Sequence, residues 1–296
     1  MTLPPMTAAE LARKVRLVEL RARKTVGGAL SGAYRSAFKG PGVEFQEVRE
    51  YVAGDDTRSI DWNVTARVGR PYIKRFAEER DQTVMLLLDG SRSNLFGTGA
   101  APKNEAAAEV FAVLALAAVY NKDEAGLILF TDDVELYVPP GRGRSHVLRL
   151  IRDVLAFQPR GRGTNITRAL EFLGKVRRRR SLVVLISDFL ADGFDRQLRV
   201  SARRHDLIAI SIFDAREERF PDCGLVQVED AESGERCTID TSNPAVRAAW
   251  DGAARQQTAA LEALFRSANI DHLRMAAGTG DLQSLIPFLR LHGARD

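Results

Sequence analysis

The sequence is poor in cysteine and has no long uninterrupted apolar run. Its two cysteines, Cys223 and Cys237, lack the CxxC spacing of zinc sites, which favours two free thiols in a reducing compartment. The longest apolar stretch covers residues 110–120, whereas a membrane-spanning helix needs roughly 20 residues. The first residues, MTLPPMTAAELARKV, also lack the apolar centre of a signal peptide. We therefore expect a cytoplasmic protein without a membrane span.

The excess of positive charge is small and dispersed. The net charge is +4, and the one dense basic run, Arg177–Arg180, falls at the end of a predicted helix, where the helix dipole favours cations. The run has no interleaved aromatic residues and belongs to no recognised nucleic-acid motif. We interpret it as a solvated helix end, and we keep an arginine-rich nucleic-acid binder as an alternative function.

Residues 1–80 are predicted to form a small N-terminal module of helix and β structure. Thr7 and Glu10 fit a capping box that begins an amphipathic helix over residues 7–25. A glycine-containing stretch over 27–42 lacks the pattern of a phosphate loop, so the chain has no visible nucleotide site. Two short strands, over 43–52 and 70–77, are expected to flank a polar turn region.

Residues 81–296 are predicted to form a larger α/β domain, because apolar strands alternate with helices. With 45% hydrophobic and 28% charged residues, the chain can bury a full core. Strands are predicted over 84–88, 125–130, 134–138 at an edge, 182–187, 207–213 and 270–275. Helices are predicted over 104–120, 145–157, 165–176, 194–203, 245–268 and 282–291, with a hairpin of 225–228 and 236–239. This alternation indicates a mostly parallel sheet with helices on both faces.

Oxygen-bearing side chains follow two of the predicted strands. Asp89, Ser91 and Ser93 lie at positions i, i+2 and i+4, which places them on one side of an extended segment. Asp188 ends a second apolar strand, and Thr164 begins a helix. In parallel sheets, ligands bind beyond the carboxyl ends of the strands. Carboxylate and hydroxyl oxygens suit Mg²⁺ or Mn²⁺, so these five residues are the candidate ligands.

Each of these features alone has a plainer explanation. An aspartate and serines after a strand usually form a turn, Thr164 alone caps a helix, and Asp188 alone could cap the helix that follows. Their joint occurrence at two strand ends, in this order, is much more specific and favours a metal site.

The same residues resemble the metal-ion-dependent adhesion site of von Willebrand factor A domains. A closer resemblance, over about residues 25–290, is to domain-of-unknown-function family 58, a bacterial branch of these proteins. It is carried by Phe45–Tyr51, Gly54–Asp56, Arg58, Ile60–Trp62, Ala66–Arg67, Glu79 and Ser187–Phe189. The resemblance implies a three-layer, Rossmann-like von Willebrand factor A-type fold.

In such sites Ser91, Ser93 and Thr164 would bind the cation directly, while Asp89 and Asp188 would act mostly through bound waters. An aspartate or glutamate of a partner protein would then complete the coordination. Asn94 departs from the apolar residue that relatives often carry at this position. We expect it to leave the oxygens unaffected and to alter the loop.

The resemblance also implies a partner. Family members tend to be encoded beside MoxR-type AAA+ ATPases, and the pair is thought to remodel or mature client complexes in a chaperone-like way. This chain would then be a protein-binding adaptor and not an enzyme. A metal-dependent phosphatase or nuclease stays an alternative, although the sequence has no HExxH or GxSxG pattern and its four histidines are scattered.

The segment from Gly54 to Trp62 has two interpretations. Its charged residues would form an ion-pair network that fixes the N-terminal module with Trp62 buried, or they would form a partner surface. We favour the structural interpretation, since buried polar networks usually specify packing. The residues concerned are Asp55, Asp56, Arg58, Asp61 and Trp62.

Overall fold

The computed structural model describes residues 7–37, 44–52, 55–57, 60–77 and 82–294, a few of them by their backbone alone. The chain divides into two compact units. One unit comprises Met1–Ala37 and Thr83–Asp296, and the other is Phe38–Gln82, which is therefore an insertion in the first. This division differs from the predicted boundary at residue 80, because the N-terminal helix joins the larger unit.

A six-stranded, mostly parallel sheet forms the centre of the larger unit. Its strands are β3 (Thr83–Asp89), β4 (Glu124–Phe130), β5 (Val134–Gly141), β6 (Leu182–Ser187), β7 (Asp206–Phe213) and β10 (Asp271–Ala276). They run in the order β10-β7-β6-β3-β4-β5, and only the edge pair β4–β5 is antiparallel. Every residue of β3 and β6 is buried, as strands covered on both faces require.

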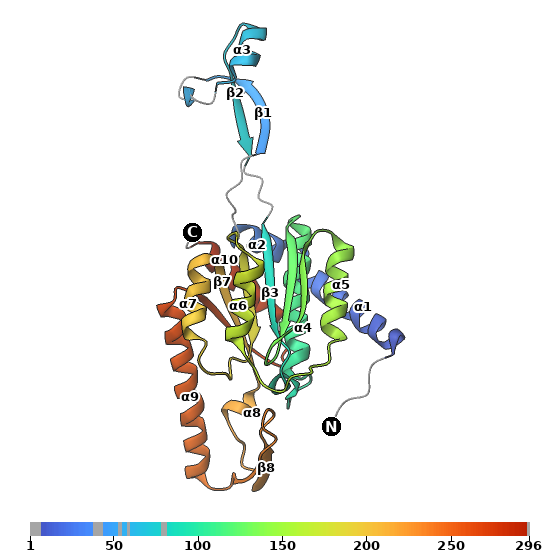
Figure 1. Cartoon of the computed structure of the whole chain (residues 1–296), viewed down its shortest axis with the longest axis vertical. Helices are drawn as coiled ribbons and strands as arrows, with labels where there is room; N and C mark the ends of the chain where they lie inside the picture. Colours follow the sequence, from blue (N-terminus) through green and yellow to red (C-terminus); the bar gives the residue numbers. More distant parts are fainter. Residues whose placement is uncertain (1–6, 38–43, 53–54, 58–59, 78–81, 295–296) are drawn as a thin grey trace. The chain divides into compact units, whose positions relative to one another are not determined.

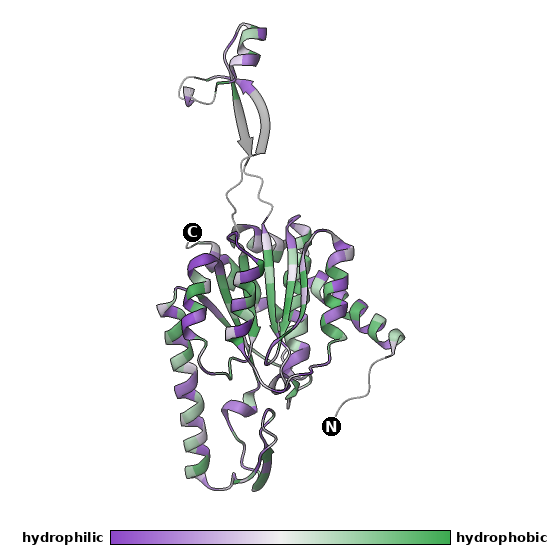
Figure 2. Cartoon of the chain, viewed as in Figure 1, coloured by the Kyte–Doolittle hydropathy of each residue, from purple (hydrophilic) through white to green (hydrophobic). Residues whose placement is uncertain are grey.

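Helices cover both faces of this sheet, which confirms the predicted three-layer fold class (Figure 1). The principal helices are α4 (Lys103–Tyr120), α5 (Arg144–Leu155), α6 (Ile166–Val176), α7 (Asp195–Arg204), α9 (Pro244–Ser267) and α10 (Leu285–Gly293). The alanine-rich α4 is almost wholly buried against one face, and α6, α7 and α9 pack on the core of the other. Figure 2 shows the resulting contrast between apolar strands and helices with hydrophilic outer faces.

The N-terminal helix α1 (Ala8–Thr25) packs on α4. Its predicted capping box is present: Thr7 and Glu10 exchange hydrogen bonds at the start of the helix. Ion pairs of 2.6 Å join Lys14 to Glu105 and Arg21 to Glu109 of α4. The chain then continues as a π-helical turn η1 (Val26–Leu30) and a helix α2 (Ser31–Ala37), for which the sequence analysis made no prediction.

The insertion contains an antiparallel pair, β1 (Glu44–Glu50) and β2 (Tyr72–Ala77), as predicted. Between them lies a short helix α3 (Trp62–Val68), which the sequence analysis missed. Asp61 caps this helix by accepting hydrogen bonds from the backbone N–H groups of Asn63 and Val64.

The predicted burial of Trp62 is wrong. Trp62 is the first residue of α3 and is 70% exposed. Asp55 forms a bidentate ion pair with Arg49, at 2.7 and 2.9 Å, and Asp56 is exposed. Arg58 lies outside the described residues. The segment is therefore held by local contacts, and the tryptophan is left at the surface.

Two smaller elements follow β7. A single-turn helix α8 (Ala215–Glu218) leads to the predicted hairpin, β8 (Leu225–Glu229) and β9 (Arg236–Asp240). The hairpin precedes α9, and both extend beyond the sheet at one end of the unit (Figure 1). Among the residues that the structure describes, no helix is both long and apolar enough to cross a membrane.

Candidate metal site at the carboxyl ends of β3 and β6

Two neighbouring strands bring the predicted acidic ligands to one edge of the sheet. Asp89 is the last residue of β3, and Asp188 follows β6, which pairs with β3 in parallel. The order of connection reverses here, because β3 leads to β4 on one side and pairs with the later β6 on the other. Such a switch point is where open α/β sheets bind their ligands.

The loop after β3 turns its polar groups inward. Asp89 Oδ1 accepts the backbone N–H of Ser91 at 2.9 Å, and the hydroxyls of Ser91 and Ser93 lie 3.0 Å apart. Asp89 is 2% exposed, Ser91 0% and Ser93 8%. A short 3₁₀ turn, η3 (Arg92–Leu95), fixes this geometry. The three DxSxS residues are therefore brought together in one buried cluster.

Asn94 is part of the same cluster, contrary to our expectation. Its amide Nδ2 donates to Ser91 Oγ at 3.2 Å and to the Asp89 carbonyl oxygen at 3.4 Å, and the side chain is buried. It therefore touches one of the oxygens that it was expected to leave unaffected. The bond from Asn94 uses one lone pair of Ser91 Oγ, and the second lone pair is available for a cation when Ser91 donates its proton to Ser93.

The second strand end is tied to the first through Ser187. Its hydroxyl donates to Asp89 Oδ2 at 2.6 Å and accepts the backbone N–H of Phe189 at 3.0 Å. Asp188 does not cap a helix: its Oδ1 accepts the N–H of Leu190 at 3.1 Å, and α7 begins only at Asp195.

The backbone between the end of β6 and the start of α7 is strained at one residue. Phe189 has a φ of 57°, in the left-handed region that non-glycine residues rarely adopt. Its ring is buried against Phe194 and Phe265, with the Phe265 ring centroid 5.2 Å away. Strain of this kind persists where packing over-determines it, and it often marks functional sites.

A buried lysine, which the sequence analysis did not single out, lies beside Asp188. Lys103 Nζ is 2.8 Å from Asp188 Oδ2 and 2.5 Å from Glu217 Oε1 of α8. Burial acts to lower the pKa of Lys103, but the charges of Asp188 and Glu217 outweigh it and raise that pKa. Lys103 is thus a permanent cation that neutralises part of the acidic charge here.

Thr164 is positioned by a clamped loop. The carboxylate of Asp132 accepts the N–H groups of Arg162 and Gly163, and Glu135 accepts those of Arg160 and Gly161. These bonds are 2.7 to 3.1 Å long. A side chain at position 163 would collide with Asp132, since a β-carbon there would lie 2.5 Å from Oδ1. The loop therefore needs its glycines.

Thr164 was predicted to cap the helix that follows it, and it does not do so. Asn165, one residue later, is the cap of α6, because its Oδ1 accepts the N–H of Arg168. The Thr164 hydroxyl instead donates to Glu232 Oε1 at 3.0 Å, in the turn between β8 and β9. No pattern in the sequence linked Glu232 to the site, because the two residues are 68 positions apart.

The site carries more negative than positive charge. Burial, and next the neighbouring charge of Asp188, raise the pKa of Asp89 to about 7. Burial also raises the pKa of Glu232, to which the charge of Asp188 contributes. One lysine faces several carboxylates, so a further cation at this edge of the sheet would be favoured electrostatically.

The donor set fits a hard divalent cation. Adjacent ligands of an octahedral Mg²⁺ lie about 2.9 Å apart, which is close to the 3.0 Å between the Ser91 and Ser93 hydroxyls. Each oxygen of the Asp89 carboxylate accepts one hydrogen bond and keeps a lone pair for a water or an ion. Among the described residues, no three histidine, cysteine, aspartate or glutamate side chains form a metal-binding group, so hydroxyl oxygens are essential to this set.

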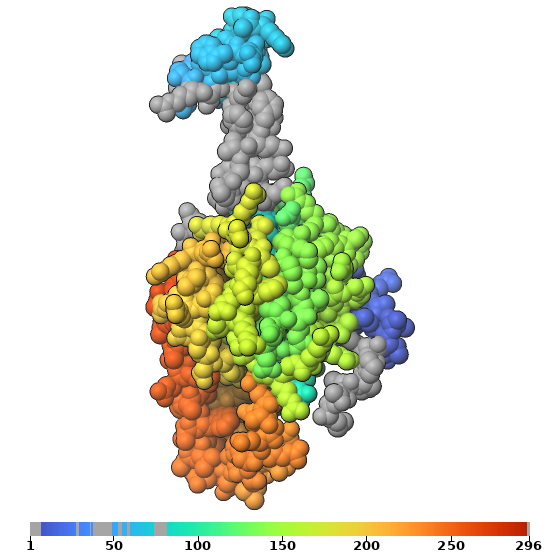
Figure 3. Space-filling view, viewed as in Figure 1, coloured from blue at the N-terminus to red at the C-terminus, as the bar shows by residue number. Residues whose placement is uncertain are grey.

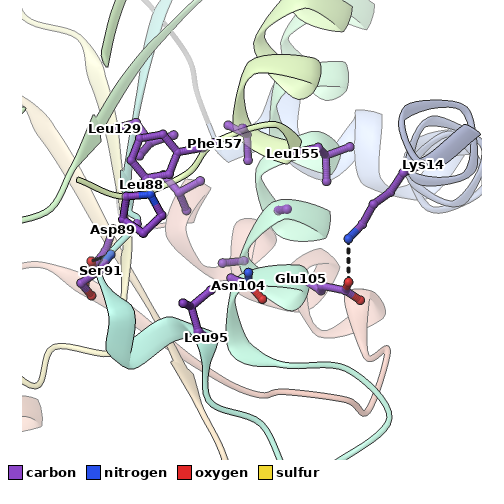
Figure 4. A pocket seen from close by; sticks show the side chains of 15 residues that line it. Lys14, Leu88, Asp89, Ser91, Leu95, Asn104, Glu105, Leu129, Leu155 and Phe157 are labelled. Atoms are coloured by element: carbon purple, nitrogen blue, oxygen red, sulfur yellow. Dashed lines mark hydrogen bonds and ion pairs between the residues drawn. The ribbon is translucent and has the colours of Figure 1, made fainter. Parts of the chain in front are cut away.

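An apolar wall closes the site on one side. A cavity of about 70 Å³ beside Asp89 and Ser91 is lined by Leu129, Phe157 and other residues (Figure 4). Phe157 lies directly over Gly90: a β-carbon on Gly90 would lie 2.4 Å from the ring. The wall lowers the local dielectric, which strengthens electrostatic interactions at the neighbouring carboxylate.

Comparison with known proteins agrees with this fold. Residues 47–260 match the family model described as "Protein of unknown function DUF58". The proteins Rv1480 of Mycobacterium tuberculosis and Mb1516 of Mycobacterium bovis are each 33% identical to this chain over 228 residues, which is 76% of this chain and 72% of the relative.

Solved structures are more distant. An aerotolerance-related membrane protein from Bacteroides fragilis superimposes with a TM-score of 0.50 at 15% identity, over 73% of this chain and 100% of that chain. The SpRpn10 VWA domain gives 0.44 at 13% identity, over 71% and 98%. The likeness to the Bacteroides fragilis structure shows the fold alone. The mostly parallel six-stranded sheet with helices on both faces agrees with the predicted von Willebrand factor A-like fold.

Proposed function

The chain belongs to the DUF58 family, and we propose that it is a protein-binding adaptor whose partner docks through a divalent cation held by Asp89, Ser91, Ser93, Thr164 and Asp188. The observation that carries this proposal is the Ser91–Ser93 hydroxyl pair, 3.0 Å apart, beside the buried carboxylate of Asp89. Bound Mg²⁺ or Mn²⁺ would supply an open coordination position for an acidic side chain of the partner.

Three of these residues would bind the cation directly, and two would act through bound waters. Ser91, Ser93 and Thr164 offer neutral oxygens that reduce little of the cation's charge, so an additional carboxylate is attracted strongly. Asp89 and Asp188, whose oxygens already accept hydrogen bonds, would act through waters. In this proposal the protein is an adaptor and not an enzyme, and none of these residues acts in catalysis.

The partner that we propose is a MoxR-type AAA+ ATPase, together with the client proteins of that ATPase. The ATPase would supply energy for chaperone-like remodelling, and this chain would present the client in the cytoplasm. The basis for this pairing is the family resemblance.

Affinity purification tests the proposal directly. Wild-type protein is expected to retain a MoxR-type ATPase encoded in the same genome with Mg²⁺ present, and to lose it with EDTA. Ser93→Ala should lose it as well, while Glu171→Ala, which removes an exposed carboxylate on α6, should behave as wild type. Capture of the ATPase that survives both EDTA and Ser93→Ala would refute cation-dependent docking.

A further inference from the structure

The turn of the β8–β9 hairpin reaches the candidate metal site. Glu232 Oε1 accepts the Thr164 hydroxyl at 3.0 Å, and Oε2 lies 3.3 Å from where a β-carbon on Gly163 would be. A carboxylate therefore already faces one of the proposed cation ligands. The hairpin and the start of α9, coloured orange, form a lobe at the lower end of the larger unit (Figure 3).

The turn forms without help from the Glu232 side chain. Asp230 Oδ1 accepts the backbone N–H groups of Glu232 and Ser233 at 3.0 and 2.6 Å, and Gly234 has a φ of 75°. These are the local bonds that shape a tight turn. The Glu232 carboxylate is thus free to serve a contact elsewhere, and the contact it makes is with Thr164.

No residue of the two hairpin strands is fully buried. One face is exposed, with Leu225 75% exposed, and the other, with Val226, Val228 and Ile239, is only half-buried. Two-stranded hairpins without a buried face are marginally stable by themselves. Within the described part of the chain, the bond between Thr164 and Glu232 is the one hydrogen bond that joins the turn of residues 230–235 to the loop before α6. Losing this bond would remove that link.

We propose that Glu232 is an internal acidic ligand of the cation site, occupying in the free protein the place that the partner's acidic side chain takes on binding. This inference rests on the proposed function. Two carboxylates cannot fill one coordination position, so the partner must displace the hairpin. The partner chemistry that fits is an aspartate or glutamate on a protruding loop, able to enter where the turn now lies.

Reciprocity follows from this arrangement. If Glu232 completes the coordination, the cation strengthens docking of the hairpin, and the docked hairpin strengthens binding of the cation by the same factor. The two effects can be measured separately on the full-length protein, with Mn²⁺ as the probe. Glu235→Gln is the matched control for Glu232→Gln, since Glu235 lies in the same hairpin and is exposed.

The first measurement counts water on the cation. Proton relaxation of water reports how many exchangeable waters bound Mn²⁺ carries, and calorimetry gives its affinity. Glu232→Gln is expected to gain an exchangeable water and to bind Mn²⁺ at least about tenfold more weakly, in the range seen when groups around a metal site are lost. Glu235→Gln should match wild type in both.

The second measurement follows the hairpin. Mn²⁺ is expected to slow hydrogen exchange of the amides of residues 225–240 in wild type and in Glu235→Gln, but not in Glu232→Gln. Acetate, as a simple carboxylate probe, should displace the additional water from Mn²⁺-loaded Glu232→Gln and leave the wild-type water count unchanged.

These outcomes separate the two proposals. Failure of wild-type protein to bind Mn²⁺ would overturn the proposed function and this inference together. Binding of Mn²⁺ by wild type, with an unchanged water count in Glu232→Gln, would overturn the internal ligand alone. A gain of water in Glu232→Gln, reversed by acetate, supports it.

Discussion

Lys103 Nζ lies 2.8 Å from Asp188 Oδ2, and neither side chain is more than 1% exposed. The lysine is the first residue of α4, where the helix dipole disfavours a positive charge. Its position therefore depends on the carboxylates of Asp188 and Glu217. This contact fixes the acidic end of β6 against α4 and α8. The positive charge of Lys103 also neutralises part of the negative charge that would attract a cation.

Replacing this lysine is expected to be strongly destabilising. Lys103→Met should lower the free energy of unfolding by about 3–5 kcal/mol, because it leaves a buried carboxylate without its partner. Urea denaturation measures this loss. The control is Lys14→Met, which breaks a more exposed ion pair with Glu105 and should change stability by less than about 1 kcal/mol. Similar losses in both variants would contradict the burial of Lys103.

Any side chain at position 90 is expected to lower the stability of the folded protein for steric reasons. Gly90→Ala should destabilise the protein by about 1–3 kcal/mol, since its β-carbon would push Phe157 and Leu129 from their places. Gly252→Ala, inside α9 with open space around it, should instead stabilise by roughly 0.5–1 kcal/mol. Thermal or urea unfolding of the two variants provides the comparison. Equal effects would be inconsistent with the close contact at Gly90.

Divalent cations are expected to stabilise the folded protein. At a Mg²⁺ concentration about 100 times its dissociation constant, linkage adds about 2.7 kcal/mol to the free energy of unfolding. Calorimetry of thermal unfolding should show a higher Tm with Mg²⁺ than with EDTA. The shift should shrink in Ser93→Ala and persist in Glu171→Ala. A wild-type Tm that does not respond to Mg²⁺ or Mn²⁺ would count against the site.

His292 is expected to make stability depend on pH. Burial acts to lower its pKa, but hydrogen bonds and charges from Asp206 and Asp271 outweigh this and raise the pKa. A raised folded-state pKa stabilises the protein fully below the unfolded value of about 6.5, and this contribution is lost as pH rises through the folded value. Urea unfolding across this range should show the loss.

The matched variant for this effect is His292→Gln. It removes the titrating ring, so the slope of stability against pH above about 6.5 should become flatter than in wild type. An identical slope in the two proteins would mean that another group is responsible.

Much of the fold was predictable because its signals are local. The apolar runs over 84–88 and 182–187 indicated buried parallel strands, and an aspartate follows each of them. The capping box of Thr7 and Glu10 marked the start of α1. The helical turns after Val26 were missed, since glycines weaken helix propensity and tertiary packing decided the outcome.

The candidate site was predictable only where its residues are close in sequence or end a strand. Asp89, Ser91 and Ser93 share one loop, so their convergence follows from local geometry. Lys103 and Glu232 were missed because their partners, Asp188 and Thr164, are 85 and 68 residues away. A lysine that begins a helix and a glutamate in a turn are both ordinarily solvated. Trp62 was predicted to be buried beside an ion-pair network, but it begins α3 and is exposed.

The insertion of residues 38–82 between α2 and β3 has an evolutionary consequence. All six strands of the central sheet, and every proposed cation ligand, come from outside it. A related chain can therefore lack the inserted segment and still keep the whole ligand cluster.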